Sequence, residues 1–472
     1  MPTVFDVPYH AARQRKEHSM NKPILAVLMF IALMSSAQAQ TTALDRLKSY
    51  IEVDTTNPPG NETRGAAFFA AIFDAEGISY EMAESAPGRG NIWARLKGGD
   101  KPGLILLHHM DVVPATREAW KTDPLKAVEI DGELYGRGTL DTKSLGIMHL
   151  EAFLALHRSG KPLNRDVIFM ATADEEAGGF FGAGWLVENR RDIFDGVGYL
   201  LNEGGRGMIS SGGKISFQIE LAQKRPYWLR LTATDVPGHG SSPLPTSATT
   251  RLIAALQRIQ EAPFEPRIVK PVRDMFAAIA DNVDPKWREP LRNIDQAILD
   301  PGFVANFQAE LPGLHALIRN TCSITVLTGS QKINVVPPTA GAELDCRILP
   351  DQDSVEFLEG IRARIDDDQI EIEEIMLFSA AESSADTPLY SLLVDKTREH
   401  FPTAGIAPAV ATGFTDSHFF RDIGIASYGY IPSLRTEAQS AGVHGNNERI
   451  GIDAFNQGVK IMSEIVEAFA TH

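Results

Sequence analysis

Residues 103–114 read GLILLHHMDVVP, which joins a short apolar run to a cluster of ionisable side chains. An apolar run of this length is typical of a buried strand. Side chains on a strand alternate between its two faces, so His109 and Asp111 share one face while His108 points the other way. The stretch therefore predicts a buried strand that presents a histidine and an aspartate together at its carboxyl end.

Two further apolar runs end in the same way. VIFMATA at 167–173 is followed by three acidic residues, and GYLL at 198–201 is followed by NEGG. Helical patterns alternate with these strand-like runs, at 44–53, 65–75 and 144–157. Such alternation predicts a layered α/β sheet flanked by helices. Because ligands bind at the carboxyl edges of the strands in sheets of this kind, we expect the three motifs to lie at one edge.

Near Lys224 the pattern changes to strands that alternate apolar and polar residues. The expected order from there is β-α-β-β-α-β, which is the ferredoxin-like motif. Its elements are expected at 227–236, 246–260, 322–328, 340–348, 354–365 and 370–376. A mostly helical insertion at about 263–320 separates its first helix from its second strand. The sequence thus predicts a second domain at 224–378, inserted into a first domain formed by 40–223 and 379–472.

The bulk composition excludes one class of partner. The chain has 472 residues, 43% of them apolar, which is enough for two cores. Its 45 basic and 61 acidic residues leave a net charge of −16, and no basic stripe with interleaved aromatic residues is present. An acidic surface repels phosphate backbones, so nucleic-acid binding is not expected.

The first 39 residues have the pattern of a secretory signal peptide. Lys22 precedes an apolar run at 24–34, and Ala-Gln-Ala at 37–39 forms a small-x-small cleavage site. Met20 would begin a compact signal by itself, so it is an alternative start. No other stretch is apolar enough to span a membrane. We therefore expect a periplasmic or secreted protein that is free of the membrane after signal cleavage.

The chain has two cysteines, Cys322 and Cys346, too few for a four-thiolate zinc site. Both lie in segments that alternate apolar and polar residues. If these two strands form a hairpin, the cysteines could lie opposite each other on its buried side. The residues leave two alternatives open, a disulfide or two buried free thiols.

Five short motifs together supply the ligands that a pair of hydrolytic metal ions requires. Taken alone, each histidine could be a core residue and each acidic residue a surface one. A two-zinc site needs a bridging carboxylate, imidazoles or carboxylates that complete each coordination shell, and a water. The candidates are His109, Asp141 in YGRGTLDTK, Glu175 and Glu176 in ATADEEAG, Glu203 in LLNEGG, and His444 in GVHGNNE.

One residue of the Glu175–Glu176 pair, and Asp111, suit supporting roles beside the metal ligands. Side chains of adjacent residues diverge at a strand end, so one of Glu175 and Glu176 can bind metal while the other reaches the water. Asp111 can accept the second imidazole N–H of His109 and fix its tautomer. His108 is then expected to be a packing residue.

On these motifs the chain resembles the superfamily of di-zinc hydrolases that contains aminoacylase, carboxypeptidase S and succinyl-diaminopimelate desuccinylase. It is most similar to the carboxypeptidase S-like branch. The resemblance implies a phosphorylase/hydrolase-like catalytic domain with a mixed sheet flanked by helices, and an inserted α+β ferredoxin-like lid domain. It also implies the following roles: His109 and Glu203 on one zinc, Glu176 and His444 on the other, Asp141 bridging both, Glu175 as general base and Asp111 as the residue that orients His109.

The resemblance extends to the expected lid. His239 in PGHGSSP matches a lid histidine that polarises the scissile carbonyl and often arrives from the partner subunit of a homodimer. Asn334 in KINVVPP and Arg347 in LDCRILP match residues that grip the substrate. An arginine can hold a carboxylate with two parallel hydrogen bonds, and a structural role for Arg347 is the alternative.

The function expected from the sequence is hydrolysis of the C-terminal amide bond of small peptides or N-acyl amino acids. Two Zn²⁺ ions per chain are expected, for which cobalt or manganese can substitute. Carboxypeptidase, dipeptidase and N-acyl amino acid amidohydrolase are not separable from the sequence. A non-catalytic exported binding protein of the same fold is a remote alternative. Glu175 argues against it, because this residue is not needed to hold metal but is needed for proton transfer.

Overall fold

The computed structural model describes residues 42–210 and 212–472. The expected signal peptide at 1–39, with its alternative start at Met20, lies outside the described residues. All elements named below belong to the unit Ala43–His472. Within the described ranges, no helix is both long and apolar enough to cross a bilayer.

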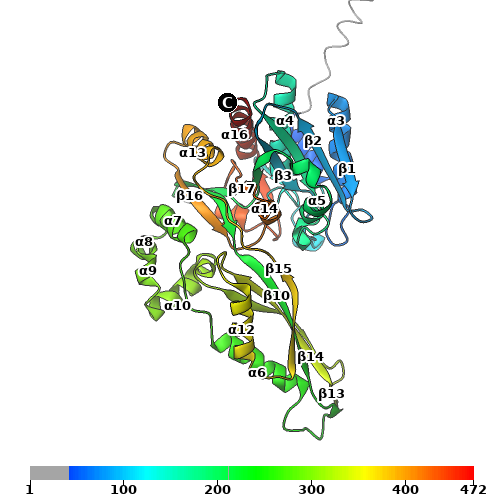
Figure 1. The fold of residues 1–472 in the computed structure, drawn as a ribbon, viewed down its shortest axis with the longest axis vertical. Helices are drawn as coiled ribbons and strands as arrows, with labels where there is room; N and C mark the ends of the chain where they lie inside the picture. Colours follow the sequence, from blue (N-terminus) through cyan, green and yellow to red (C-terminus); the bar gives the residue numbers. More distant parts are fainter. Residues whose placement is uncertain (1–41, 211) are drawn as a thin grey trace, which may run out of the picture. The chain divides into compact units, whose positions relative to one another are not determined.

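A large mixed sheet of ten strands forms the centre of the upper half of Figure 1. Strands β6, β3, β7 and β17 are parallel neighbours, and antiparallel strands flank them. The order is β1 (Tyr80–Glu84), β2 (Gly90–Leu96), β6 (Arg165–Thr172), β3 (Lys101–His109), β7 (Val197–Asn202), β17 (Ala426–Gly429), β9 (Ile215–Gln223), β8 (Arg206–Ile209) and β18 (Leu434–Arg435), with β16 (Gly405–Ala411) beside β9.

Helices cover both faces of this sheet, which explains why its central strands are continuously apolar. Leu104 and Leu106 of β3 pack in one core cluster, and Ile105 and Leu107 pack in another on the opposite face. The first cluster includes α2 (Ala43–Ile51), α3 (Glu62–Glu76), α4 (Lys143–Ser159), α13 (Pro388–His400) and α16 (Ile452–Thr471). The second includes α5 (Ala183–Asn189), η3 (Arg191–Phe194) and α14 (Ser417–Arg421). The predicted α/β sheet flanked by helices is confirmed.

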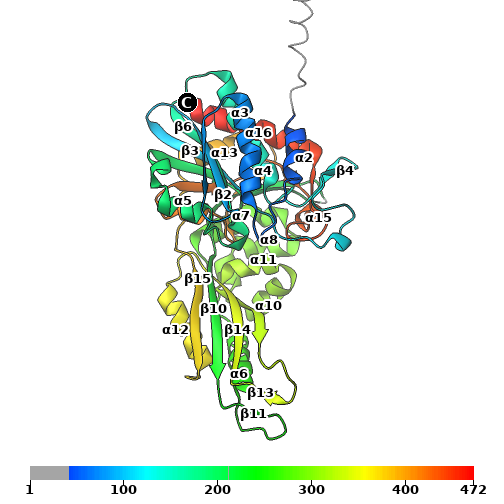
Figure 2. The same cartoon turned by 90° about the vertical axis from the view of Figure 1, so that its right-hand side faces the viewer.

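A second sheet has its own core. Its four antiparallel strands follow the order β12 (Thr321–Thr328), β14 (Thr339–Ile348), β10 (Arg225–Thr234) and β15 (Ile370–Leu377). Side chains of α6 (Ala248–Glu261) and α12 (Ser354–Ile365) pack on one face of this sheet and form a hydrophobic core with its strands. Figure 2 shows the two-residue strands β11 (Gly238–His239) and β13 (Val335–Val336) at the end of this sheet that lies away from the large one. The expected β-α-β-β-α-β order is therefore present.

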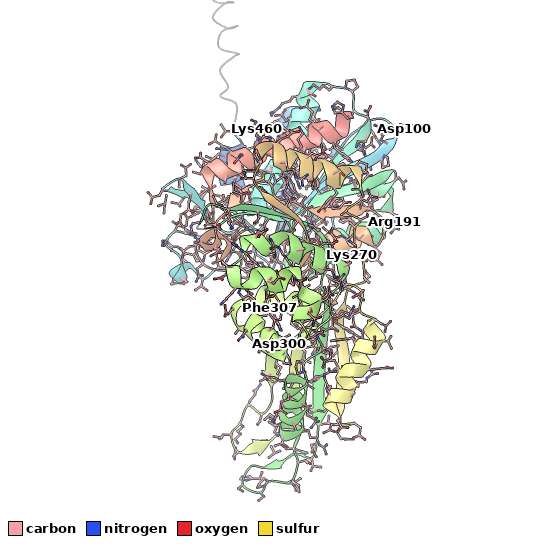
Figure 3. The ribbon with its side chains drawn as sticks, turned by 90° about the vertical axis from the view of Figure 1, so that its left-hand side faces the viewer. Asp100, Arg191, Lys270, Asp300, Phe307 and Lys460 are labelled. Atoms are coloured by element: carbon pink, nitrogen blue, oxygen red, sulfur yellow. A yellow bond between two sulfur atoms is a disulfide. The ribbon has the colours of Figure 1, made fainter. Side chains whose placement is uncertain are left out.

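The helical segment between α6 and β12 packs on the large sheet. Val272, Met275, Phe276 and Phe307 belong to the same core cluster as β3, not to the cluster under α6 and α12. Figure 3 labels Lys270 and Phe307 on these helices and Asp300 directly before one of them. Their bounds are α7 (Lys270–Ile279), η4 (Ala280–Asn282), α8 (Pro285–Arg292), α9 (Ile294–Ala297), α10 (Pro301–Glu310), α11 (Pro312–His315) and η5 (Ala316–Ile318). Although inserted in the chain between elements of the small sheet, this segment therefore extends the core of the large one.

A three-stranded sheet joins distant parts of the chain. Its order is β19 (Arg449–Gly451), β5 (Glu133–Tyr135) and β4 (Val128–Ile130). The remaining short helices are η1 (Arg117–Ala119), η2 (Glu175–Ala177) and α15 (Glu437–Ser440). Because β19 pairs with β5, the segment after His444 lies beside the segment before Asp141.

The two cysteines form a disulfide. Cys322 of β12 lies directly opposite Cys346 of β14 in the antiparallel pairing, and Cys346 is fully buried. Of the two alternatives that the sequence left open, the disulfide is the one observed.

Candidate metal centre

Three of the five motifs meet at the carboxyl ends of adjacent parallel strands, as predicted. His109 is the last residue of β3 and pairs in register with Thr172 at the end of β6. Glu175 and Glu176 follow β6 in the short helix η2, and Glu203 comes directly after β7. Since β6, β3 and β7 are neighbours that run in the same direction, their ends place these side chains at one edge of the sheet.

Two groups of candidate ligands share the carboxylate of Asp141. In the first, His109 Nε2 lies 3.0 Å from Asp141 Oδ1 and 3.5 Å from Glu203 Oε1. In the second, His444 Nε2 lies 3.2 Å from Asp141 Oδ2 and 3.0 Å from Glu176 Oε2. Within each group the ligand atoms all lie within 4.8 Å of one another. Each oxygen of Asp141 thus faces a different group.

The donor chemistry of this centre fits divalent cations. Burial, together with the negative charge of Asp141, raises the pKa of Glu203 well above its ordinary value. Burial opposes ionisation of Asp141 too, but hydrogen bonds with His109 and His444 outweigh it and lower the pKa of that carboxyl. Glu176 Oε1 is buried and has no hydrogen-bond partner among the described residues. Crowded carboxylates with an unsatisfied oxygen, completed by imidazole nitrogens, form a set of ligands that suits zinc and similar ions.

Asp111 links the histidine to the acidic turn. Its Oδ1 lies 3.3 Å from His109 Nδ1, the contact expected from the sequence, and the same Nδ1 lies 3.0 Å from the backbone oxygen of Asp111. The backbone N–H groups of Glu175 and Glu176 donate to Oδ1 and Oδ2 of the same carboxylate, each at 3.1 Å. Asn57 Nδ2 donates to Oδ2 at 2.8 Å. One buried carboxylate therefore orients both the imidazole of His109 and the turn that carries Glu175 and Glu176.

His108 points away from the centre, as expected. It is fully buried, its Nε2 lies 3.3 Å from Tyr50 Oη, and its ring packs edge-on against Phe69. Burial lowers the pKa of His108, so the ring is a neutral packing group.

Glu175 belongs to neither ligand group but lies next to both. The residue is buried, and burial together with the charge of Glu203 raises the pKa of Glu175 well above its ordinary value. A carboxylate that is not needed as a ligand, and that binds a proton more readily than usual, suits proton transfer at this edge.

Two buried acidic residues near the centre were not anticipated. Asp416 accepts a hydrogen bond from Thr172 Oγ1 at 3.0 Å, and burial raises the pKa of Asp416 to about 8. Glu448 accepts hydrogen bonds from the loop that carries Asp141. Glu448 lies four residues after His444 in the motif GVHGNNE, so proximity to a recognised motif was the available signal for that residue.

The structure does not bring His239 and Asn334 to this centre. Both are exposed, and they lie near each other, because His239 pairs with Val335 and Gly240 N donates to Asn334 O at 2.9 Å. The ten-residue strand β10 separates this tip from the large sheet, a span of roughly 33 Å. The two residues therefore do not reach the five candidate ligands of their own chain in this conformation.

Arg347 lies at the other end of the small sheet, opposite Pro226. Its Nε and Nη2 donate to the two oxygens of Asp345 at 2.6 and 3.2 Å, and its guanidinium lies 5.4 Å from the ring centre of Phe414. The edge of the guanidinium formed by Nε and Nη2, which could hold a substrate carboxylate with two parallel hydrogen bonds, is thus occupied by Asp345. Nη1 is buried and has no partner within the described part of the chain, which leaves one donor for a ligand.

Comparison with known proteins identifies the family. A family model described as Peptidase family M20/M25/M40 matches residues 105–468. The mouse protein named N-fatty-acyl-amino acid synthase/hydrolase PM20D1 is 27% identical over 462 residues, which cover 93% of this chain and 90% of the mouse protein. Rat aminoacylase-1B is 27% identical over 433 residues, which cover 90% of this chain and 94% of the rat protein.

Solved structures agree on the fold. The M20 family metallo-carboxypeptidase Sso-CP2 from Sulfolobus solfataricus aligns with a TM-score of 0.68 at 19% identity, covering 90% of this chain and 99% of that one. The family model includes the segments that contain all five candidate ligands. The resemblance to aminoacylases and carboxypeptidases is confirmed: the chain is a hydrolase that belongs to Peptidase family M20/M25/M40.

Proposed function

We propose that this protein is an exported hydrolase that binds two Zn²⁺ ions and cleaves the C-terminal amide bond of N-acyl amino acids or small peptides. The observation that supports it most directly is the pair of ligand groups that share Asp141. His109 and Glu203 would hold one ion, Glu176 and His444 the other, and Asp141 both.

The side chains around this pair have complementary roles in amide hydrolysis. Two divalent cations bound here would supply Lewis-acid polarisation of the substrate carbonyl and would lower the pKa of water. The Glu175 carboxylate takes a proton from the attacking water and passes it to the leaving amine. Asp111 keeps His109 in one tautomer and holds the Glu175 turn in place.

The lid residues complete the site from another chain or another conformation. His239 would donate a hydrogen bond to the developing oxyanion. Because His239 and Asn334 lie together on the exposed tip of the small sheet, they suit the centre of a partner subunit in a homodimer formed through that sheet. Sedimentation analysis tests this arrangement, and a strictly monomeric active enzyme would contradict it.

An exposed aromatic ring shortly after η2, which carries Glu175 and Glu176, supports N-acyl amino acids among the possible substrates. Phe180, three residues after η2, is 51% exposed, and its ring centre lies 6.0 Å from that of Phe378 and 6.2 Å from that of Phe419. An apolar acyl group can cover such exposed aromatic surface. The mouse relative is named as an N-fatty-acyl-amino acid synthase/hydrolase and the rat relative as an aminoacylase, which supports this substrate class.

A substrate screen tests the proposal. The metal-free protein, reconstituted with zinc, cobalt or manganese, is assayed on N-acyl amino acids of increasing acyl length and on dipeptides. We expect turnover only with metal, and faster turnover of apolar N-acyl amino acids than of dipeptides. Preference for dipeptides would identify a dipeptidase instead, and metal binding without turnover of any amide would identify a binding protein.

Export rests on the sequence pattern of residues 1–39. Fractionation of the producing cell and N-terminal sequencing of the mature protein test it. We expect the chain outside the cytoplasm with Gln40 as its first residue. An intact N-terminus in the cytoplasmic fraction would contradict export without affecting the metal chemistry.

A further inference from the structure

Glu448 is a fully buried carboxylate whose two oxygens each accept two hydrogen bonds. Oε1 accepts from the backbone N–H groups of Leu140 at 2.6 Å and Asp141 at 3.0 Å. Oε2 accepts from Gly138 N at 3.0 Å and Arg137 Nη1 at 2.7 Å. All four donors belong to the loop that carries Asp141, whereas Glu448 follows His444 in the chain.

Arg137, in the loop that carries Asp141, also binds the backbone of the loop that carries His444. Besides its ion pair with Glu448, Arg137 donates from Nη2 to the backbone carbonyl of Gly445 at 2.8 Å. Gly445 is the residue after His444. The Arg137 guanidinium lies 5.1 Å from the ring centre of Trp120, and its side chain is 3% exposed. The loop with Asp141 and the loop with His444 are thus joined by a buried ion pair that also binds the backbone on both sides.

We infer that Glu448, held by Arg137, is a positioning residue that fixes Asp141 relative to His444 and so determines the affinity of the centre for metal. The inference rests on the proposed roles of Asp141 and His444 as ligands. The physical reason is that a ligand carboxylate can serve two ions only if its backbone is fixed. Here two consecutive N–H groups, those of Leu140 and Asp141, are held by one oxygen.

A buried charge of this kind is costly unless every donor and acceptor around it is satisfied. Four donors satisfy Glu448, and its exposure to solvent is nil. The same low dielectric makes each of these hydrogen bonds stronger than it would be in water. The cluster is therefore rigid in the way that a supporting group around a metal site must be.

The substitution Glu448→Gln tests the inference with little change of shape. A glutamine keeps one acceptor oxygen and replaces the other by an NH₂ group. In either orientation of the amide, that NH₂ faces two donors: Leu140 N and Asp141 N, or Gly138 N and Arg137. The loop with Asp141 must then shift away, although no proposed ligand has been changed.

Glu151→Gln provides a matched control. Glu151 on α4 forms an ion pair with Arg46 on α2, in which the side chains are 13% and 10% exposed. This pair contacts none of the candidate ligands. The two variants therefore make the same chemical change at a largely buried ion pair, once beside the centre and once away from it.

Zinc affinity of the metal-free proteins is measured by competition with a chromophoric chelator, and amide hydrogen exchange of residues 138–141 is measured in the same samples. For Glu448→Gln we expect zinc affinity to fall about 10- to 100-fold and exchange at 138–141 to accelerate. For Glu151→Gln we expect both to match the wild type. If Glu448→Gln does not fold, Arg137→Lys, which keeps the charge but loses the contact with Gly445, should weaken zinc binding in the same direction.

Unchanged zinc affinity in Glu448→Gln, or an equal loss in Glu151→Gln, would overturn the inference and leave the proposed function intact. Failure of the wild-type protein to bind zinc, cobalt or manganese would overturn both.

Discussion

His444 Nε2 lies 3.0 Å from Glu176 Oε2, although the two residues are far apart in the chain. The contact depends on β19, which pairs with β5 and so brings the C-terminal segment to the carboxyl edge of the large sheet. The second ligand group is therefore assembled by the last part of the chain, whereas the first group needs only residues up to Glu203.

If each ligand group binds one ion, as proposed, the two ions should be removable separately. His444→Ala should leave the first group intact, so the protein should retain one equivalent of zinc. Asp141→Asn should lower the content to well below one equivalent, because it alters the ligand that the groups share. Metal analysis after dialysis measures the stoichiometry. Two equivalents in Asp141→Asn would show that the groups do not share this ligand.

The proposed general base can be separated from the ligands. Glu175 lies in neither ligand group, so Glu175→Gln and Glu175→Ala should keep the wild-type metal content. Loss of a general base should lower kcat by about 10²- to 10⁴-fold. Metal analysis combined with steady-state kinetics measures both. Near-normal kcat in either variant would remove Glu175 from the proton transfer.

Arg347 tests how a substrate carboxylate is held. Its Nη1 is the donor left without a partner, and Asp345 holds the rest of the guanidinium. One charge-assisted hydrogen bond contributes about 1.5–3 kcal/mol, so Arg347→Ala should raise KM by roughly 10- to 100-fold for a substrate with a free carboxylate. Arg347→Lys should restore little, because an ammonium cannot keep the two contacts with Asp345.

The control for Arg347 is the matching substrate with an amidated C-terminus. It should be poor for the wild type and should lose little more in Arg347→Ala. An equal loss for both substrates would mean that Arg347 is structural, supporting Asp345 and the ring of Phe414.

The disulfide should stabilise the small sheet without affecting the metal centre. Cys322 and Cys346 are separated by 24 positions in the sequence. A cross-link that closes a loop of that length in the unfolded chain stabilises the folded state by about 3.5 kcal/mol. Replacing both cysteines by serine should therefore lower the free energy of unfolding by about that amount, measured in denaturant, with metal content unchanged. A reductant should reduce the stability of the wild type but not of the double variant.

Much of the site could be predicted because its residues stand where strands end. Apolar runs that are recognisable in the sequence precede four of the candidates, His109, Glu175, Glu176 and Glu203. Adjacent parallel strands bring such ends together. The order of elements in the small sheet could also be predicted, because alternation of apolar and polar residues indicates a strand with one buried face. Unlike Asp111, the supporting residues Asn57 and Glu448 could not be found in this way. Asn57 donates to the side-chain carboxylate of Asp111, and Glu448 accepts from backbone N–H groups of another loop; hydrogen bonds of either kind leave no periodic pattern.

The sequence by itself determined the local elements, the chemistry of the ligands and the family. Hydrophobic periodicity and residue type are local properties, so they can be read from the sequence without knowing which elements pack together. Only the tertiary structure decided that Asp141 faces His109 and His444 with different oxygens, and that Asp345 occupies the edge of the Arg347 guanidinium formed by Nε and Nη2. It alone placed His239 in a separate strand pair beyond one end of the small sheet, with Arg347 at the other end, and packed the helices after α6 on the large sheet. These relationships depend on strand register and on which apolar surfaces meet, and both are set by packing between segments distant in the chain.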